Sequence, residues 1–153
     1  MLKIAVVDDE IVFVESLINK ITAVCEKLNL EFKIDKYSNG FDILENYSKY
    51  HLIFLDIEMP SIDGIATAKR INELKSSAEI PFIVYVTSHD ELVFDALKSV
   101  PYSFIRKSKI ESDLYECINR INNSFEELHK TIVLHTERKD IPIVIDDIIY
   151  LEK

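Results

Sequence analysis

The sequence has few of the residues on which several protein classes depend. Its 153 residues include two cysteines, two glycines and no tryptophan. Cys25 and Cys117 lie far apart and form no C-x-x-C pair, which argues against a zinc site or a disulfide framework and indicates two buried thiols. No apolar run approaches the roughly 20 residues that span a bilayer, and no signal-peptide core precedes the acidic Asp8-Asp9-Glu10. We therefore expect a cytoplasmic protein without membrane contact.

Basic residues are too few for a typical nucleic-acid binder. The chain has 18 lysines and arginines against 27 aspartates and glutamates, and its net charge of −9 has the wrong sign for neutralising a phosphate backbone. Hydrophobic residues make up 48% of the sequence, which is enough apolar material for a real core. The length predicts one domain and at most a fragment of a second.

Five short apolar segments alternate with longer amphipathic ones, and this alternation predicts a parallel sheet covered by helices. We expect strands at residues 3–7, 31–37, 51–55, 81–86 and 102–105. We expect helices at residues 11–29, 41–49, 65–74, 88–98 and from 108 to about 129. Capping-box patterns at residues 88–91 and 108–111 predict the starts of the last two helices.

Side chains that can do chemistry follow the expected strands where each strand ends. They are Asp8, Asp9 and Glu10 after the first strand, Asp56 after the third, Thr87 and Ser88 after the fourth, and Lys107 after the fifth. Because ligands of open parallel sheets bind outside the carboxyl ends of the strands, we expect these side chains to converge at one edge.

The composition of this cluster indicates phosphoryl chemistry assisted by a cation. Carboxylates without histidine or cysteine favour a hard ion such as Mg2+, whose coordination a substrate phosphate can complete. Thr87 can donate a hydrogen bond to a phosphoryl oxygen and Lys107 can pair with its charge, which leaves Asp56 as the acceptor that forms an acyl phosphate. The simpler alternatives are that Asp8 and Asp9 cap a helix and that Lys107 is a solvated charge.

Four segments, V-V-D-D-E, L-D-I-E-M-P-S-I-D-G, V-T-S and F-I-R-K, resemble in order and spacing the receiver domain of bacterial two-component response regulators. The resemblance covers residues 1 to about 125. It implies an α/β fold of the flavodoxin-like, doubly wound (βα)5 type, with a parallel sheet in the strand order 2-1-3-4-5. It also implies that Asp56 is the phosphoacceptor.

The resemblance assigns further roles to matching positions. Asp8 and Asp9 resemble the family's acidic metal pair, and Glu58 resembles the residue whose backbone carbonyl joins the Mg2+ shell. Thr87 and Lys107 match the residues that bind the phosphoryl group and switch. The metal set implied in this way is Asp8, Asp9, Asp56 and the Glu58 carbonyl, with Mg2+ as the cofactor.

Several positions depart from the family pattern or have two interpretations. Ser108 follows Lys107 where the family usually has a proline after a cis peptide bond, so the geometry of this bond is open. Phe104 stands at the aromatic switch position without the hydroxyl of the commoner tyrosine. The side chains of Glu58 and His89 either tune the lifetime of the acyl phosphate or are ordinary surface groups.

The last part of the chain has its own pattern. Residues 1–129 are expected to form the receiver domain, and residues 130–153 a linker and short β tail. The tail reads as three short strands, and its I-D-D-I-I-Y-L-E segment resembles the beginning of a LytTR-type DNA-binding domain. DNA contact would depend on the missing part of that domain, because the tail is itself acidic.

The function implied is a signalling switch and not an enzyme, with at most weak self-dephosphorylation. A sensor histidine kinase would phosphorylate Asp56, and a LytTR-type domain in the parent protein would regulate transcription. The alternative is a stand-alone receiver that signals through protein contacts.

A homodimer through the fourth helix, fifth strand and fifth helix is possible, because the last helix carries an apolar stripe that fits either a core or a dimer seam. A phosphoaspartyl hydrolase would need D-x-D-x-T, and a flavin module a glycine-rich loop; the chain lacks both.

Overall fold

The computed structural model describes residues 1–76, 80–128, 131–135 and 140–144. The chain divides into two compact units, Met1–Ile118 and Asn119–Lys153, and helix α5 (Ile110–Leu128) runs from the first into the second. The predicted receiver boundary at residue 129 stays a prediction.

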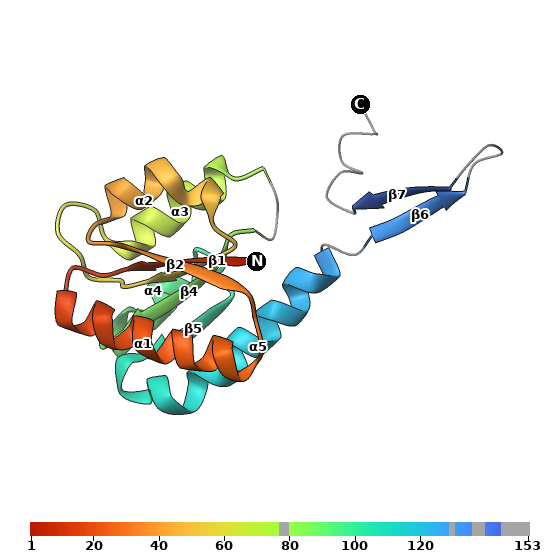
Figure 1. Cartoon of the computed structure of the whole chain (residues 1–153). Coiled ribbons are helices and arrows are strands. Elements are labelled where there is room, and N and C mark those ends of the chain that lie inside the picture. The colour runs from red at the N-terminus through yellow and green to blue at the C-terminus, as the bar shows by residue number, and fades with distance from the viewer. Residues whose placement is uncertain (77–79, 129–130, 136–139, 145–153) are drawn as a thin grey trace. The chain divides into compact units, whose positions relative to one another are not determined.

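The first unit is built on a five-stranded, all-parallel sheet (Figure 1). Its strands are β1 (Leu2–Val7), β2 (Phe32–Tyr37), β3 (Leu52–Leu55), β4 (Phe82–Thr87) and β5 (Ser103–Arg106). They lie in the order β2-β1-β3-β4-β5, which confirms the flavodoxin-like prediction. β2 is an edge strand and is only half buried, as its alternating sequence predicts.

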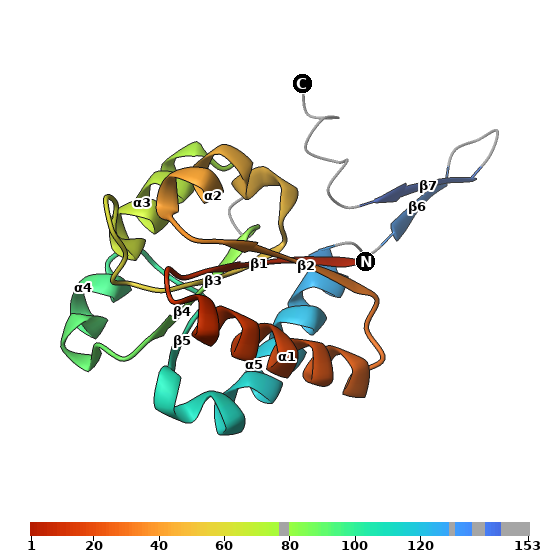
Figure 2. The ribbon, with the colours of Figure 1, turned by 60° about the vertical axis from the view of Figure 1, so that its left-hand side comes forward.

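Helices cover both faces of this sheet. They are α1 (Ile11–Lys27), α2 (Gly40–Asn46), α3 (Gly64–Leu74), α4 (Val93–Leu97) and α5, with the short 3-10 turns η1 (Tyr47–Lys49), η2 (Asp90–Leu92) and η3 (Lys107–Lys109). Figures 1 and 2 show α1 and the beginning of α5 on one face, and α2 and α3 on the other.

The core fixes the positions of the strand ends. Strands β3 and β4 are buried along their whole length, as strands covered on both faces must be. Alternate residues of β1, β3 and β4, such as Val7, Leu55 and Tyr85, pack against Ala96 of α4 and buried residues of α2 and α3. The backbone of the polar residues that follow the strands is therefore anchored to the buried apolar core.

The structure corrects the predicted start of the helix after β4. α4 begins at Val93 after a 3-10 turn, because the Thr87 hydroxyl accepts a hydrogen bond from the His89 backbone N–H and makes a local turn where the Ser88 capping box was expected. α5 begins at Ile110, two residues after the predicted start, because residues 107–109 leave β5 through a tight 3-10 turn that includes Ser108. This helix and the other predicted elements are confirmed to within about three residues at each end.

The second unit contains a hairpin of β6 (Thr131–His135) and β7 (Asp140–Val144), which pair antiparallel. These match the first two strands predicted for the tail. The third predicted strand, and with it the I-D-D-I-I-Y-L-E segment, lies outside the described residues.

Candidate functional site

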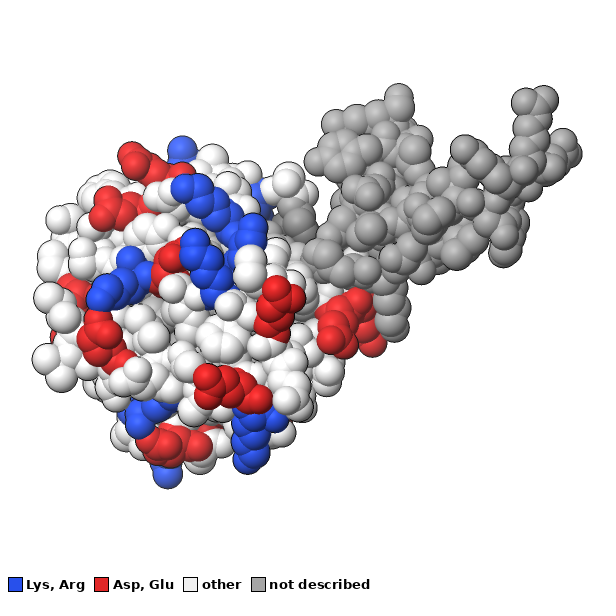
Figure 3. All heavy atoms as spheres, in the orientation of Figure 1, with Lys and Arg blue, Asp and Glu red and all other residues white. Residues whose placement is uncertain are grey.

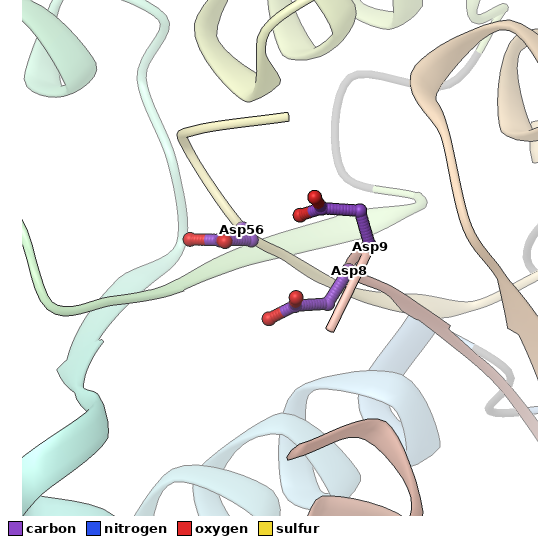
Figure 4. A group of neighbouring side chains, drawn as sticks. All are labelled: Asp8, Asp9 and Asp56. Atoms are coloured by element: carbon purple, nitrogen blue, oxygen red, sulfur yellow. The ribbon is translucent and has the colours of Figure 1, made fainter. Parts of the chain in front are cut away.

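Three carboxyl groups converge at the carboxyl ends of neighbouring strands. Asp8 and Asp9 follow β1 and Asp56 follows β3, and the two strands are joined at this end by a 2.9 Å hydrogen bond from the Asp56 N–H to the Val7 carbonyl. One oxygen atom from each carboxylate lies within 4.8 Å of the others. Figure 4 shows the side chains reaching from the two strand ends into the same region.

Two of these carboxyl groups are buried. Asp8 is 3% exposed and Asp56 is 5% exposed, whereas Asp9 faces solvent. Burial raises the pKa of both buried groups above the ordinary value, and the neighbouring charge of Asp8 raises the pKa of Asp56 further. Keeping both groups ionised at neutral pH therefore requires positive charge at the site.

Lys107 supplies part of this charge. Its side chain is 11% exposed, and its Nζ atom lies 2.7 Å from Asp8 Oδ2 and 3.3 Å from Asp56 Oδ2. Burial alone would lower the pKa of Lys107, but its close contacts with the carboxylates of Asp8 and Glu10 and the charge of Asp56 outweigh it, so the pKa is raised. The lysine is thus held as an ammonium.

The donor set fits a magnesium ion. The three ligands are carboxylate oxygens, which is the ligand chemistry that Mg2+ prefers. Asp8 Oδ2 is buried and, although it lies close to Lys107, it accepts no hydrogen bond of normal geometry. Its remaining coordination capacity is what a cation would use.

The predicted switch residues lie on the strands that carry the site. Thr87 is fully buried at the end of β4, where its hydroxyl accepts the 3.2 Å hydrogen bond from His89. Phe104 on β5 stands beside Tyr85 of β4 in the sheet and packs partly buried against the core. The Lys107-Ser108 peptide bond, left open by the sequence, is trans.

Glu58 and His89, singled out separately in the sequence, are a contacting pair. His89 Nε2 lies 3.0 Å from Glu58 Oε2, and its Nδ1 lies 3.0 Å from Glu91 Oε1. The hydrogen bond to Glu91, aided by the charge of Glu58, raises the pKa of His89. The loop after β3 is in this way joined to the loop after β4.

A close backbone approach fixes the loop that follows Asp56. The Gly64 N–H donates a 2.7 Å hydrogen bond to the Ile57 carbonyl. A Cβ atom on Gly64 would lie 2.0 Å from the Asp56 carbonyl oxygen, so a side chain cannot be accommodated without moving the Asp56 backbone.

Two contacts of Lys107 were missed by the sequence reasoning. Glu10 Oε1 lies 3.1 Å from Nζ, and Nζ lies over the Phe13 ring at 4.2 Å from its centroid. Glu10 was recognised as part of the acidic run, but neither contact could be derived, since the partners are more than 90 residues apart.

Comparison with known proteins identifies the family of this fold. Residues 4–119 match the family model of the response regulator receiver domain. The chain belongs to this family. It is therefore the receiver domain of a two-component response regulator, and receiver domains are signalling domains that typically bind Mg2+ at an acidic pocket.

Individual relatives are similar over different lengths. The response regulatory domain of protein MrkE from Klebsiella pneumoniae superposes with a TM-score of 0.70 at 26% identity, covering 82% of this chain and 99% of that one. The transcriptional regulatory protein YpdB of Escherichia coli K12 is 26% identical over 99% of this chain and 65% of its own length. The sensory transduction protein LytR of Staphylococcus epidermidis is 29% identical over 62% of this chain and 38% of its own length.

The chain thus spans between about a third and two thirds of the length of these curated relatives. Within the part of the chain that the structure describes, no helix combines the length and apolarity needed to cross a bilayer.

Proposed function

We propose that Asp56 accepts a phosphoryl group from a sensor histidine kinase. The observation that carries this proposal is the juxtaposition of a buried Asp56 carboxylate, the Lys107 ammonium at 3.3 Å and the carboxylates of Asp8 and Asp9. A carboxylate desolvated beside a fixed ammonium is suited to attack an electrophilic phosphorus, because the resulting negative charge is already compensated.

The transfer step requires little covalent chemistry from the protein. An Asp56 oxygen forms a bond to phosphorus while the bond between phosphorus and the donor nitrogen breaks, and the electron pair leaves with that nitrogen. Asp8, Asp9, Asp56 and the Glu58 backbone carbonyl would hold a bound Mg2+, which neutralises phosphoryl charge. Lys107 keeps its proton, because its pKa is raised, and pairs with a phosphoryl oxygen.

The phosphorylated state would be detected by Thr87 and Phe104. The Thr87 hydroxyl would exchange its contact with the His89 backbone for one with the phosphoryl group. Movement at the end of β4 would then reach Phe104 of β5, because Phe104 is the sheet partner of Tyr85 in β4. Since Phe104 has no hydroxyl, its switch would work through a change in burial.

Glu58 and His89 would tune how long the acyl phosphate lasts. Their side chains pair across the loops that flank Asp56. We infer that this pair lies near the approach of the attacking water, so that it affects self-dephosphorylation without taking part in phosphorylation. We expect self-dephosphorylation to be weak at most, so the protein is not an enzyme.

We infer that the output in the parent protein is control of transcription through a LytTR-type domain. The similarity to a transcriptional regulatory protein over 99% of the chain, and the β6–β7 hairpin after α5, support this inference.

A homodimer through α4, β5 and α5 is the proposed means of activation, because Phe94 and Leu97 of α4 are exposed apolar side chains. A stand-alone receiver acting by protein contact is the alternative, and the cytoplasmic location stays a prediction.

Intact-mass spectrometry tests the phosphoacceptor function. The chain is incubated with a small acyl-phosphate donor with and without Mg2+, alongside Asp56→Asn and Asp90→Asn. Asp90 is a suitable control because it is an exposed acid paired with Arg106. We expect one added phosphoryl group that requires Mg2+, is absent from Asp56→Asn and is retained by Asp90→Asn. A folded wild-type chain that gains no mass would contradict the proposal.

A further inference from the structure

Lys107 is contacted by two residues at the start of α1 to which the proposed chemistry gives no role. Its Nζ atom lies 3.1 Å from Glu10 Oε1 and over the face of the Phe13 ring, 4.2 Å from the centroid. Glu10 and Phe13 are three positions apart at the first turn of the helix, a spacing that places side chains on the same face. Together they form one side of the surroundings of the ammonium.

The backbone of Glu10 is fixed by the site itself. Glu10 is the N-cap residue of α1, its N–H donates a 2.8 Å hydrogen bond to Asp8 Oδ1, and its carbonyl accepts from the Val14 N–H. Its side chain makes no capping hydrogen bond. N-cap positions favour Ser, Thr, Asp or Asn for that purpose, and here the longer glutamate instead reaches Lys107.

The Phe13 ring contributes an interaction of a different kind. An aromatic face attracts an ammonium through its quadrupole and does not use one of its three N–H donors. The attraction is larger where water is excluded, and the Lys107 side chain is 11% exposed. A lysine has a flexible four-carbon stem, so a contact that fixes its head without occupying its donors leaves them available for oxygen ligands.

We propose that Phe13 and Glu10 are positioning residues for Lys107. The Phe13 ring holds the ammonium beside Asp8 and Asp56, and Glu10 occupies one donor until a phosphoryl oxygen takes its place. This inference rests on the proposed phosphorylation of Asp56 and deepens it, because it identifies what prepares the lysine for the incoming group.

The geometry is tested first without phosphorylation. Protons on the ε-methylene of a lysine beneath an aromatic ring are shifted upfield in the NMR spectrum by the ring current. We expect this shift for Lys107 in the Mg2+-free wild-type chain, with Lys107→Arg identifying the signal. Phe13→Tyr should keep the shift and Phe13→Leu should lose it. A folded wild-type chain in which the Lys107 signal is unshifted would overturn the inference.

The consequence is tested by the rate at which a small acyl phosphate labels Asp56 at saturating Mg2+. Phe13→Leu should be slower by about three- to tenfold, the range that an aromatic–ammonium contact at a partly desolvated site can supply. Phe13→Tyr should keep the wild-type rate, because it keeps the aromatic ring. If Phe13 served only as an apolar side chain, Phe13→Leu would keep the rate as well. Tyr115→Leu is the matched control, because Lys27 lies over the Tyr115 ring at 4.8 Å outside the site, and its rate should equal that of the wild type.

The two possible failures can be told apart. A wild-type chain that shows the ring-current shift and takes no phosphoryl group would overturn the proposed function, and the inference with it. A wild-type chain that is labelled at a rate unchanged by Phe13→Leu would overturn the inference alone.

Discussion

At the residue scale, the site contains two buried carboxyl groups, Asp8 and Asp56, and burial raises the pKa of both. The Lys107 ammonium offsets part of their negative charge. A raised pKa means that the folded protein binds protons more tightly at these carboxyl groups than the unfolded chain does. Stability from Asp8 and Asp56 is therefore present at low pH and lost as the pH rises from their ordinary value of 3.8 through the higher folded value. The free energy that this arrangement costs at neutral pH is what a bound cation would recover.

Asp56→Asn tests this electrostatic cost. Without Mg2+ at pH 7, the substitution should increase the free energy of unfolding, because an unfavourable buried charge is removed. The difference should shrink as the pH falls toward 3.8. Urea unfolding across this range measures it. Glu73→Gln, which breaks the exposed pair with Arg70, should change little at any pH. A less stable Asp56→Asn variant at pH 7 would show that the charge is fully compensated.

Gly64→Ala tests the close backbone approach behind the phosphoacceptor. The added Cβ would meet the Asp56 carbonyl oxygen at 2.0 Å, so the backbone there has to shift. We expect a loss of roughly 1–3 kcal/mol in the free energy of unfolding, as for an overpacked core, and slower labelling of the protein that remains folded. Thermal unfolding and intact-mass labelling measure the two effects. An unchanged labelling rate would mean that the site tolerates a shifted backbone.

At the element scale, the strand ends and most helix starts could be predicted from the sequence, but the start of α4 could not. Each of β1, β3, β4 and β5 was predicted from an apolar segment that is followed by a polar residue. Parallel strands bring those polar residues to one edge of the sheet, so the sequence predicted that Asp8, Asp56, Thr87 and Lys107 lie together. The capping box expected at Ser88 did not start α4, because the Thr87 hydroxyl accepts the His89 N–H and forms a local turn there. The contacts of Glu10 and Phe13 with Lys107 depend on how the start of α1 lies beside the turn η3, which no local pattern encodes.

The connection from α4 to β5 offers a test of local backbone strain. Val100 follows the end of α4 with a φ of 51°, a left-handed conformation that is unfavourable for a β-branched residue. Its side chain is 83% exposed, so little packing would be lost on its removal. Val100→Gly should therefore stabilise the protein by about 1 kcal/mol in urea unfolding.

The matched control is Val12→Gly, at a position that is 86% exposed within α1. There the backbone is helical, so glycine should destabilise the protein by about 0.5 kcal/mol. Destabilisation by both substitutions would show that Val100 contributes packing that outweighs its strain.

At the scale of the whole molecule, the chain carries an excess of negative charge. The net charge is −9, and the face shown in Figure 3 mixes acidic and basic side chains. We predict that this chain has no measurable affinity for duplex DNA at physiological salt in fluorescence anisotropy, phosphorylated or not. Saturable binding whose affinity falls with salt would contradict the assignment of DNA contact to a further part of the parent protein.

We expect Asp56 to be the residue that becomes phosphorylated. Borohydride reduces an aspartyl phosphate to homoserine, which leaves a stable mark that peptide sequencing by mass spectrometry can locate. After incubation with an acyl-phosphate donor and Mg2+, we expect homoserine at position 56 and aspartate at positions 8 and 9. Homoserine at another position, or unmodified aspartate at 56 in a chain that had gained a phosphoryl group, would contradict it.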